Sequence, residues 1–471
     1  MNIAIRSIGL ATAQGNTAEI LKSESFHGPA DLPWIASKWN VSRVCFPAVG
    51  IDSSLSGVAR WQALVKEAFA DVGVTGNTPL LVASCNGSAG ERWAEAFNTT
   101  ALLAGTPWAE NVLPVFSSSC ASGVHALYAA HKLLMSGAVD EVLVLAADIL
   151  ARSNHENFES LRVLAEKPAT PWQSTSTGFI LGEAAVVLKL GQANIDELPV
   201  LHGPELASDL VKHDGLSDVI EALSPRNPTL IFGQGTGPYA NDAAELKALA
   251  TFTDKKIPIA TPLTYFGHTL GASSLLSIAL AAALPSTSNS TDKTSDGRTI
   301  NKGGPPWPPL SGIKSVLATC RALNGACAAT RVGGIAHAAA AQRRIGKWKK
   351  TVTPGPLMNL TLKRVAAEAL EYRPVQPPDV LIVSLENPIE PPRSAVIGGR
   401  LLPSAVLEIT PGFASQLIAL CWGYSGPALC LVGNVDADPY GLRNAFRKSG
   451  QSVSQVNLRG TGDNRAIEWN V

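Results

Sequence analysis

Residues 115–137 read VFSSSCASGVHALYAAHKLLMSG, a short apolar stretch followed by three serines, a cysteine and a long alanine-rich run. The pattern places Cys120 after a strand and directly before a helix. At such a position, free backbone N–H groups and the positive end of the helix dipole stabilise a thiolate. Small neighbours such as Ser119, Ala121 and Gly123 keep the sulfur approachable and leave the N–H of Cys120 free to bind an oxyanion. On this segment alone, a buried cysteine that only fills space is the more common alternative.

The rest of the chain alternates between short runs rich in Val, Ile and Leu and alanine-rich helical stretches, a pattern typical of α/β layers. Helices are expected at 121–136 and 269–284, because both are rich in Ala and Leu and contain no internal proline. Buried strands are expected at 80–84, 142–147, 184–190, 229–232 and 315–319.

Two changes in composition divide the chain into parts. Residues 285–308 contain little to bury and several helix breakers, so a surface loop is expected there. Residues 342–357 are basic and then turn-forming, as a linker would be. We therefore expect one catalytic unit, with halves at 1–190 and 191–341, and an appended α/β lobe at 358–471. Within that lobe, strands are predicted at 379–387, 404–410 and 426–434, and a helix at 413–423.

The composition narrows the classes of protein to which the chain can belong. Its 471 residues are 46% hydrophobic and 16% charged, enough for two or three lobes with apolar cores. Thirty-eight Lys and Arg balance thirty-eight Asp and Glu, so no global field draws the protein to nucleic acid or to an anionic membrane. The seven cysteines are scattered, without CxxC spacing or the density of a secreted disulfide scaffold. Neither a signal peptide nor an apolar run of about 18 residues is expected, which favours a reducing, cytoplasmic setting.

Six segments, in order, resemble the β-ketoacyl synthases of the thiolase superfamily. The resemblance implies a thiolase-like fold, with α-β-α-β-α layers built from two pseudo-repeated halves. It also implies that Cys120 accepts an acyl group as a thioester from an acyl carrier protein or coenzyme A, in fatty acid or polyketide biosynthesis. No metal or organic cofactor is implied, and the expected assembly is a homodimer or a heterodimer with another synthase-like chain. The segments are IRSIGLATAQGN (5–16), SSSCASG (117–123), TPWQSTSTGFILGEAAVVLKL (170–190), GQGTGPYANDAAE (233–245), FGHTLGASS (266–274) and RVGGIAHAAAA (331–341).

The resemblance also assigns the centre of the site. His268, in GHTLGA, matches the second active-site histidine of these enzymes and is expected to face the sulfur. The family's first histidine is replaced by Gln234, which keeps a neutral N–H donor but cannot titrate. Degradative thiolases use asparagine there, so Cys120, Gln234 and His268 are expected to polarise a thioester together. The lysine that synthases place five residues before the second histidine is Leu263 here.

Four further residues are expected to support the site. Glu245 and Asp242 fall on the family's acidic positions after the first histidine loop. A structural ion pair or a charge at a helix start is an equal alternative for both. Val332 replaces the gating phenylalanine before Gly333, and its backbone N–H is expected to serve the oxyanion hole.

Three functions stay open at this point. The first is a condensing enzyme that joins the acyl group on Cys120 to a malonyl-type extender. The second is an acyltransferase that passes the acyl group to an amine, hydroxyl or thiol, with His268 as general base. The third is a non-catalytic subunit similar to a chain-length factor, although the intact cysteine and histidine argue against it. Dinucleotide binding is not expected, because the loop GQGTGPYA does not have GxGxxG spacing.

The appended lobe raises a separate question. Its segment LPSAVLEITPGFASQLIALCWGYSGPALCLVGN resembles the N-terminal half of synthase-like partners such as chain-length factors, without a CASG nucleophile. One hypothesis is a degenerate second thiolase-type half that helps to shape the pocket or dimer face of the first. The alternative is an unrelated α/β cap.

Overall fold

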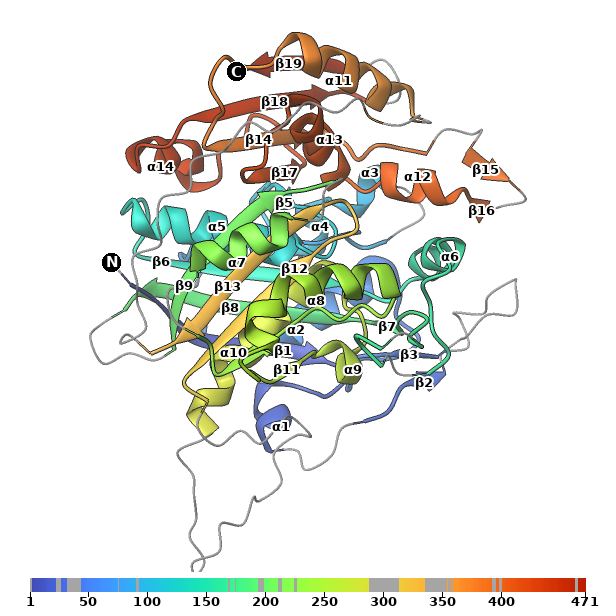
Figure 1. The fold of residues 1–471 in the computed structure, drawn as a ribbon, viewed down its shortest axis with the longest axis vertical. Coiled ribbons are helices and arrows are strands. Elements are labelled where there is room, and N and C mark those ends of the chain that lie inside the picture. The colour runs from blue at the N-terminus through green and yellow to red at the C-terminus, as the bar shows by residue number, and fades with distance from the viewer. Residues whose placement is uncertain are drawn as a thin grey trace, which may run out of the picture.

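The computed structural model of the chain is an α/β structure in which one 14-stranded sheet runs through the molecule (Figure 1). Two small sheets, of two and three strands, lie apart from it. The structure describes residues 2–22, 27–31, 44–74, 76–89, 93–167, 170–173, 175–193, 199–210, 214–223, 227–287, 313–334, 354, 357, 359–391, 395–397, 400–461 and 465–471.

Ten strands form two halves that share one strand order. The first half runs across the sheet as β1 (Ile3–Thr12), β8 (Ala184–Gln192), β6 (Glu141–Asp148), β4 (Leu80–Ala83) and β5 (Val115–Phe116). The second half runs as β9 (Val200–Ser208), β13 (Ala326–Gly333), β12 (Ser315–Arg321), β10 (Leu230–Phe232) and β11 (Ile259–Ala260). In each half the first two pairings are antiparallel and the last two are parallel. The halves join where β1 pairs with β9, which confirms the predicted pseudo-repeat.

Helices fill and cover the two halves. The helices α5 (Ser122–Met135) and α10 (Ser273–Thr287) contact each other and the strands of both halves. The helix α5 is buried without interruption from Ser122 to Ala130, as a helix apolar on all sides must be. The helix α2 (Gly57–Ala70) covers the first half, and α7 (Gly215–Leu223) with α8 (Tyr239–Thr253) covers the second. These are the α-β-α-β-α layers that the family resemblance implies.

The appended lobe repeats the outer part of the first half. Its strands β17 (Ala428–Val432), β14 (Val380–Leu385) and β18 (Val453–Arg459) are parallel, and β19 (Ala466–Asn470) is antiparallel beside β18. The strands β5, β4, β6 and β8 have the same order and directions. The helix α14 (Leu442–Lys448) links β17 to β18 as α5 links β5 to β6, and α11 (Leu360–Glu371) precedes β14 as α2 precedes β4. This correspondence supports the hypothesis of a degenerate half and counts against an unrelated cap.

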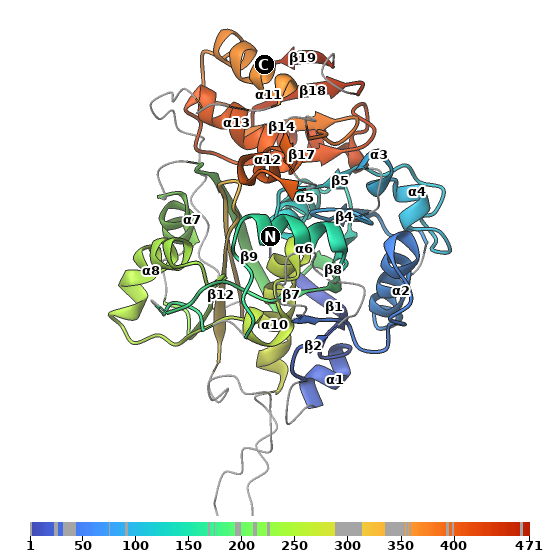
Figure 2. The same ribbon diagram turned by 90° about the vertical axis from the view of Figure 1, so that its right-hand side faces the viewer.

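The lobe joins the first half edge to edge (Figure 2). The strands β5 and β17 pair antiparallel, with Phe116 opposite Leu431. Just beyond the pair, the N–H of Ser117 donates to the carbonyl of Cys430 at 3.0 Å. In the neighbouring strand β4, the N–H of Leu80 donates to the hydroxyl of Tyr440 in the lobe at 2.9 Å. The lobe therefore continues the central sheet and occupies the free edge of β5.

Most sequence predictions of elements hold, with one clear exception. The predicted strands in the first two parts correspond to β4, β6, β8, β10 and β12, and residues 413–423 are found in α13 (Gly412–Trp422). Residues 404–410, predicted as a strand, instead belong largely to the helix α12 (Pro403–Glu408). Pro403 suits the first turn of a helix. Ala405, Val406 and Ile409 are buried on one face of this helix, so the spacing of the apolar residues follows the helical period and not the alternation of a strand.

Two predicted boundaries fall mostly outside the described residues. Residues 285–287 continue α10 instead of opening a loop, whereas 288–308 are not described. Of the predicted linker at 342–357, only residues 354 and 357 are described. Within the part of the chain that the structure describes, no helix is both long enough and apolar enough to span a membrane.

The remaining elements are short. They are α1 (Thr17–Lys22), β2 (Ala30–Asp31), β3 (Val44–Phe46), α3 (Trp93–Ala96), α4 (Thr99–Leu102), α6 (Arg152–Ser160), β7 (Leu181–Gly182), α9 (Leu263–Phe266), η2 (Leu270–Ala272), β15 (Val396–Ile397), β16 (Arg400–Leu401) and η5 (Pro439–Gly441).

The junction between the lobe and the first half predicts the effect of one substitution. A Cβ on Gly412, at the start of α13, would lie 2.6 Å from Ser118 Cα and 2.8 Å from the Ser117 carbonyl oxygen. Because both contacts are with backbone, Gly412→Ala is expected to lower the free energy of unfolding by about 1–3 kcal/mol, as overpacking does. Urea unfolding measures the change. The control Gly28→Ala, whose Cβ meets nothing within 4 Å, should leave the midpoint nearly unchanged, and equal midpoints for both variants would contradict the close contact.

Candidate active site

Cys120 lies in a tight turn between β5 and α5. Ser119 has φ of 54°, a left-handed conformation that is uncommon outside glycine and is found where a turn presents a functional side chain. The hydroxyl of Ser122 accepts the N–H of Ser118 at 2.9 Å and donates to the carbonyl of Ser119 at 2.6 Å. These bonds hold Cys120 directly before the helix, as the sequence predicts.

His268 meets the sulfur from the second half of the molecule. Its Nε2 lies 3.2 Å from the Sγ of Cys120. The backbone of His268 is bonded to the first half, because its N–H donates to the Ile180 carbonyl at 2.8 Å and its carbonyl accepts the N–H of Gly182 at 3.1 Å. Gly267, with φ of 69°, allows this approach, since a Cβ there would lie 2.9 Å from the Gly182 nitrogen. The predicted facing of thiol and imidazole is therefore present.

The hydrogen bonds of His268 assign its tautomer. Its Nδ1 accepts the backbone N–H of Leu270 at 3.2 Å. A ring nitrogen that accepts a hydrogen bond carries no proton, so the proton of the neutral imidazole is on Nε2. The Nε2–H therefore points at Sγ as a donor.

Burial keeps both partners neutral. It lowers the pKa of His268 to about 4, and Phe179 stacks on the imidazole with the ring centroids 4.5 Å apart. Burial also raises the pKa of Cys120 to about 12, although hydrogen bonds from its own N–H and from the N–H of Leu323 act in the opposite direction. The expectation that the helix dipole holds a thiolate is therefore wrong for the unacylated site, because lost hydration outweighs the dipole.

Gln234 completes the group around the sulfur. Its Oε1 accepts the N–H of Arg321 at 2.8 Å, which orients the amide. Its Nε2 is buried and has no hydrogen-bond partner among the described residues. The amide is close enough to Cys120 to lower the pKa of that thiol. The structure thus brings together Cys120, His268 and Gln234, with the Nε2–H of His268 directed at the sulfur and the amide N–H of Gln234 nearby and unpaired within the described part of the chain.

Glu245 and Asp242 hold the loop that carries Gln234. The Glu245 carboxylate accepts the N–H groups of Gln234 and Gly235 at 2.7 and 2.9 Å and the indole N–H of Trp172 at 2.9 Å. The Asp242 carboxylate accepts the N–H groups of Gly237 and Trp172 at 2.9 and 2.7 Å. Burial raises the pKa of Glu245 and of Asp242, and these hydrogen bonds oppose the rise. Both carboxylates therefore act on the loop backbone, and among the residues that the structure describes neither forms the ion pair considered from the sequence. Asp242 also lies in the first turn of α8, as the alternative of a charge at a helix start expects.

The prediction for Val332 and Gly333 is wrong. They lie at the far end of β13, opposite Val316 and Ser315 on β12, and Val332 is fully buried. That position is roughly 17 Å along the strand from Cys327, where the β12–β13 hairpin approaches the site. Leu323, in the hairpin turn, is the residue that lines the hollow beside Cys120 and directs its N–H at the sulfur. The repeated glycines after Val332 misled the motif match.

Asp148 is a central residue that the sequence analysis missed. At the end of β6, its carboxylate accepts the hydroxyl of Ser84 and the N–H groups of Cys85, Asn86 and Gly271, at 2.8 to 3.1 Å. Burial raises the pKa of Asp148 to about 6, although the hydrogen bonds from these four donors act in the opposite direction. A Cβ on Gly271 would lie 2.7 Å from this carboxylate, so the glycine of GHTLGA is required for the contact. The available signal was an aspartate that ends an apolar strand, which sequence alone does not separate from a surface residue.

Two hollows meet this group of side chains. The first, of about 510 Å³, is lined by Cys120 and Leu323, by Phe158 at α6, and by Val406 and Ile409 from the lobe. The second, of about 330 Å³, lies beside Gln234 and Leu263 and is rich in serine and threonine hydroxyls. Among the described residues, no group of three His, Cys, Asp or Glu side chains is arranged to hold a metal ion.

Comparisons with known proteins place the chain near one family. Residues 114–193 match the beta-ketoacyl synthase N-terminal domain. Nodulation protein E of Rhizobium leguminosarum bv. trifolii is 29% identical over 192 residues, 35% of this chain and 46% of that protein. A putative polyketide beta-ketoacyl synthase 1 of Streptomyces virginiae is 26% identical over 201 residues, 37% of this chain and 48% of that protein. The chain thus spans about half the length of these relatives, and the resemblance seen in the motifs is confirmed.

Solved structures show the same fold. One match is a chain from the structure of a type II polyketide synthase acyl-carrier protein in complex with its ketosynthase. Its TM-score is 0.56 at 17% identity, over 71% of this chain and 99% of that one. The PfaC keto synthase-chain length factor matches with a TM-score of 0.65 at 12% identity, over 98% of this chain and 74% of that one. The second match includes the appended lobe. The fold is therefore the thiolase-like fold of the ketosynthases.

The raised pKa of Cys120 predicts how its alkylation depends on pH. Because burial favours the thiol, the thiolate fraction should keep rising with pH throughout the range from 7 to 10. Iodoacetamide alkylation, followed on the Cys120 peptide by mass spectrometry, should accelerate over this whole range. Glutathione in the same buffers provides the control, since its alkylation levels off near an ordinary thiol pKa. A plateau for Cys120 below pH 8 would show a stabilised thiolate and contradict this assignment.

Proposed function

We propose that the chain is a condensing enzyme of the β-ketoacyl synthase type that acts in fatty acid or polyketide synthesis. In the first step, the sulfur of Cys120 attacks an acyl thioester, a new thioester forms, and the released carrier thiol takes up the proton that Cys120 loses. In the second, a malonyl-type thioester loses carbon dioxide and its enolate carbon attacks the acyl carbonyl. The bond between the carbonyl carbon and Cys120 then breaks, and the sulfur regains a proton.

The observation that carries this proposal is the Cys120 thiol beside the Nε2–H of His268, with a second N–H donor on the neighbouring Gln234 that is unpaired within the described chain. His268 Nε2–H is 3.2 Å from Sγ, and Gln234 offers an amide N–H that has no other partner among the described residues. Decarboxylation places negative charge on an enolate oxygen, and fixed donors in a buried site stabilise such charge most strongly. Both donors are neutral at pH 7, so the site is already set before the extender arrives.

The acyltransferase alternative fits this geometry less well. It requires a general base with a free lone pair near the acceptor. The Nδ1 of His268 is engaged with the N–H of Leu270, and its Nε2 carries the proton. With a pKa near 4, the imidazole is also a weak base. The non-catalytic alternative is disfavoured by the paired thiol and imidazole, which a subunit that only sets chain length does not need.

The proposal includes the partners of the reaction. An acyl carrier protein or coenzyme A would deliver the acyl group, as a carrier protein is bound to the ketosynthase in one similar structure. A homodimer or a heterodimer with a second synthase-like chain is part of the proposal, formed through a surface other than the β5 edge that β17 covers. Activity in the cytoplasm is likewise proposed, because the chemistry needs a reduced thiol.

Replacement of the nucleophile tests the first step. Cys120→Ala is expected to abolish the acyl adduct that forms when the protein is mixed with acyl carrier protein thioesters. Intact-protein mass spectrometry measures the adduct. The control is Cys421→Ala, because Cys421 is a buried cysteine of α13 away from the hollow. The control should form the adduct as the wild type does, and an adduct that persists in Cys120→Ala would remove Cys120 from the mechanism.

Replacement of Gln234 tests the second step. Gln234→Leu removes the N–H donor and should lower carbon dioxide release from a malonyl carrier by on the order of 10²-fold, the usual cost of an oxyanion donor. Gln234→His should raise it, because imidazole supplies a donor that can also titrate. Gln62→Leu is the matched control, since Gln62 lies in α2, outside both hollows, and donates to the Ala101 carbonyl. Unchanged release in both Gln234 variants would mean that this amide does not face the extender.

A further inference from the structure

Trp172 packs against the loop that carries Gln234. A Cβ on Gly233 would lie 2.7 Å from Cζ2 of the Trp172 ring, and a Cβ on Gly235 would lie 3.1 Å from the same atom. These two glycines flank Gln234, and their lack of a side chain allows the ring to approach the backbone closely. The indole ring therefore lies directly on the loop, both before and after Gln234.

Both N–H groups of Trp172 bind carboxylates of α8. Its backbone N–H donates to the Asp242 carboxylate at 2.7 Å, and its indole Nε1–H donates to the Glu245 carboxylate at 2.9 Å. The same two carboxylates accept N–H groups of the loop, and Glu245 accepts that of Gln234 itself at 2.7 Å. Trp172 thus reaches the loop directly through its ring and indirectly through each carboxylate.

The backbone of Trp172 is held in an uncommon conformation. Its φ of 62° lies in the left-handed region, which a residue with a bulky side chain rarely adopts. Such a conformation costs free energy and persists only where the surrounding contacts outweigh it. The hydrogen bonds to Asp242 and Glu245 are contacts of this kind. Residues held in this way gather at functional sites, and this turn brings the indole onto the loop of Gln234.

The Glu245 carboxylate is held by neutral donors. It is 3% exposed, and in the described part of the chain it binds the N–H groups of Gln234 and Gly235, the indole of Trp172 and the hydroxyl of Thr319. Burial raises the pKa of Glu245, and the hydrogen bond from the indole opposes the rise. Loss of one donor would leave part of a buried charge without a partner, so the other bonds would have to rearrange.

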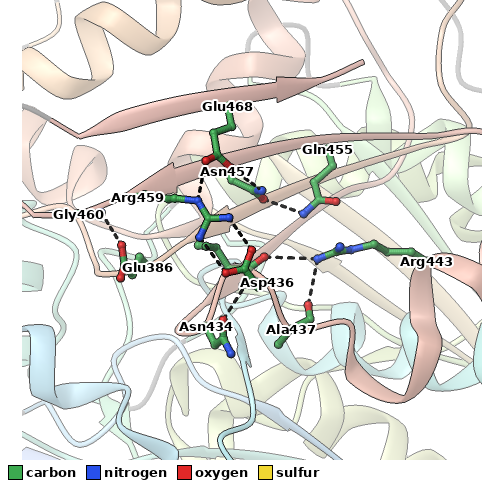
Figure 3. Close-up of polar contacts among 11 residues, drawn as sticks. Glu386, Asn434, Asp436, Ala437, Arg443, Gln455, Asn457, Arg459, Gly460 and Glu468 are labelled. Carbon is green, nitrogen blue, oxygen red and sulfur yellow. Dashed lines mark hydrogen bonds and ion pairs between the residues drawn. The ribbon is translucent and has the colours of Figure 1, made fainter.

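The lobe contains carboxylates that are held in a different way (Figure 3). Asp436 and Glu468 both bind the guanidinium of Arg459, which lowers the pKa of each carboxylate. These groups are partly exposed, so water can replace a lost hydrogen bond. Neither compensation is present at Glu245, where the described partners include no cation and burial excludes water. The indole donor therefore matters more to Glu245 than a single bond matters on the lobe surface.

We propose that Trp172 is a positioning residue for decarboxylation, whose ring and two N–H groups fix the loop so that the amide N–H of Gln234 is held where the enolate of the extender forms. The inference rests on the proposed role of Gln234 and adds the residue that maintains it. Trp172 lines neither of the two hollows described above, so it acts through Gln234 and not by contact with a substrate.

The test removes the indole donor and keeps an aromatic ring. Trp172→Phe should lower carbon dioxide release from a malonyl carrier by on the order of tenfold, because a small displacement of a catalytic group is costly. The acyl adduct on Cys120 should still form, which shows that the variant is folded. Trp469→Phe is the matched control, since the Trp469 indole donates to the Glu368 carboxylate of the lobe at the same 2.9 Å. It should leave carbon dioxide release unchanged.

A double variant shows whether Trp172 acts through Gln234. Trp172→Phe combined with Gln234→Leu should release carbon dioxide no more slowly than Gln234→Leu alone, because the donor to be positioned is already absent. An equal loss from Trp172→Phe with and without Gln234 would overturn the inference, because it would show a general structural effect. Unchanged release in Trp172→Phe would overturn it as well. Trp172→Leu repeats the comparison if Trp172→Phe fails to fold.

The outcomes separate this inference from the function on which it rests. A loss of release in Gln234→Leu, without a loss in either Trp172 variant, would overturn the role of Trp172 alone. Unchanged release in Gln234→Leu would overturn the role of the amide and, with it, the inference. Absence of both the Cys120 adduct and carbon dioxide release in the wild type would overturn the proposed function itself.

Discussion

The structure depends on the burial of a thiol and an imidazole at the meeting place of two halves of the chain. Cys120 and His268 are separated by 148 positions in the sequence, yet their reactive atoms are 3.2 Å apart. Removal from water keeps both groups neutral, since it lowers the pKa of the imidazole and raises that of the thiol. A site of this kind works through oriented hydrogen-bond donors and the exclusion of water, and it stores no charge before the substrate binds.

Such a site requires loops that do not move, and buried carboxylates hold them. Asp148 binds the backbone after β4 and the GHTLGA loop at once, and Glu245 binds the loop of Gln234. Glu183 accepts the N–H groups of Ala48 and Leu150 and pairs with the buried Arg60. A buried carboxylate without partners would be costly, so each of these positions is stable only when all of its donors are in place. The hydrogen bonds that offset the cost of burying these carboxylates therefore also hold the loops that carry the side chains of the site.

The lobe extends this logic to the outer edge of the sheet. An unpaired edge strand is a site for unwanted association, and β17 covers the edge of β5 within the same chain. Because β5 leads directly to the nucleophile turn, the strand pairing also brings α12 and α13 against that turn. Coverage of the edge and enclosure of the hollow beside Cys120 are thus consequences of one contact.

The sequence by itself predicted the α/β class and the position of Cys120 before a helix, because hydrophobic periodicity and short motifs are local properties. Its resemblance to the β-ketoacyl synthases implied the two repeated halves and the facing of Cys120 and His268. It also identified Gln234 as the informative departure from the family. Only the tertiary structure decided which hairpin reaches the sulfur, Leu323 in place of Val332, since that depends on strand register across the sheet. The helix at Pro403–Glu408 and the neutral state of Cys120 were decided in the same way, by burial against segments far away in the chain. Local sequence patterns indicate which secondary structures and protonation states are available to a residue. Its exposure to water and its neighbours in the folded chain decide which of them it adopts.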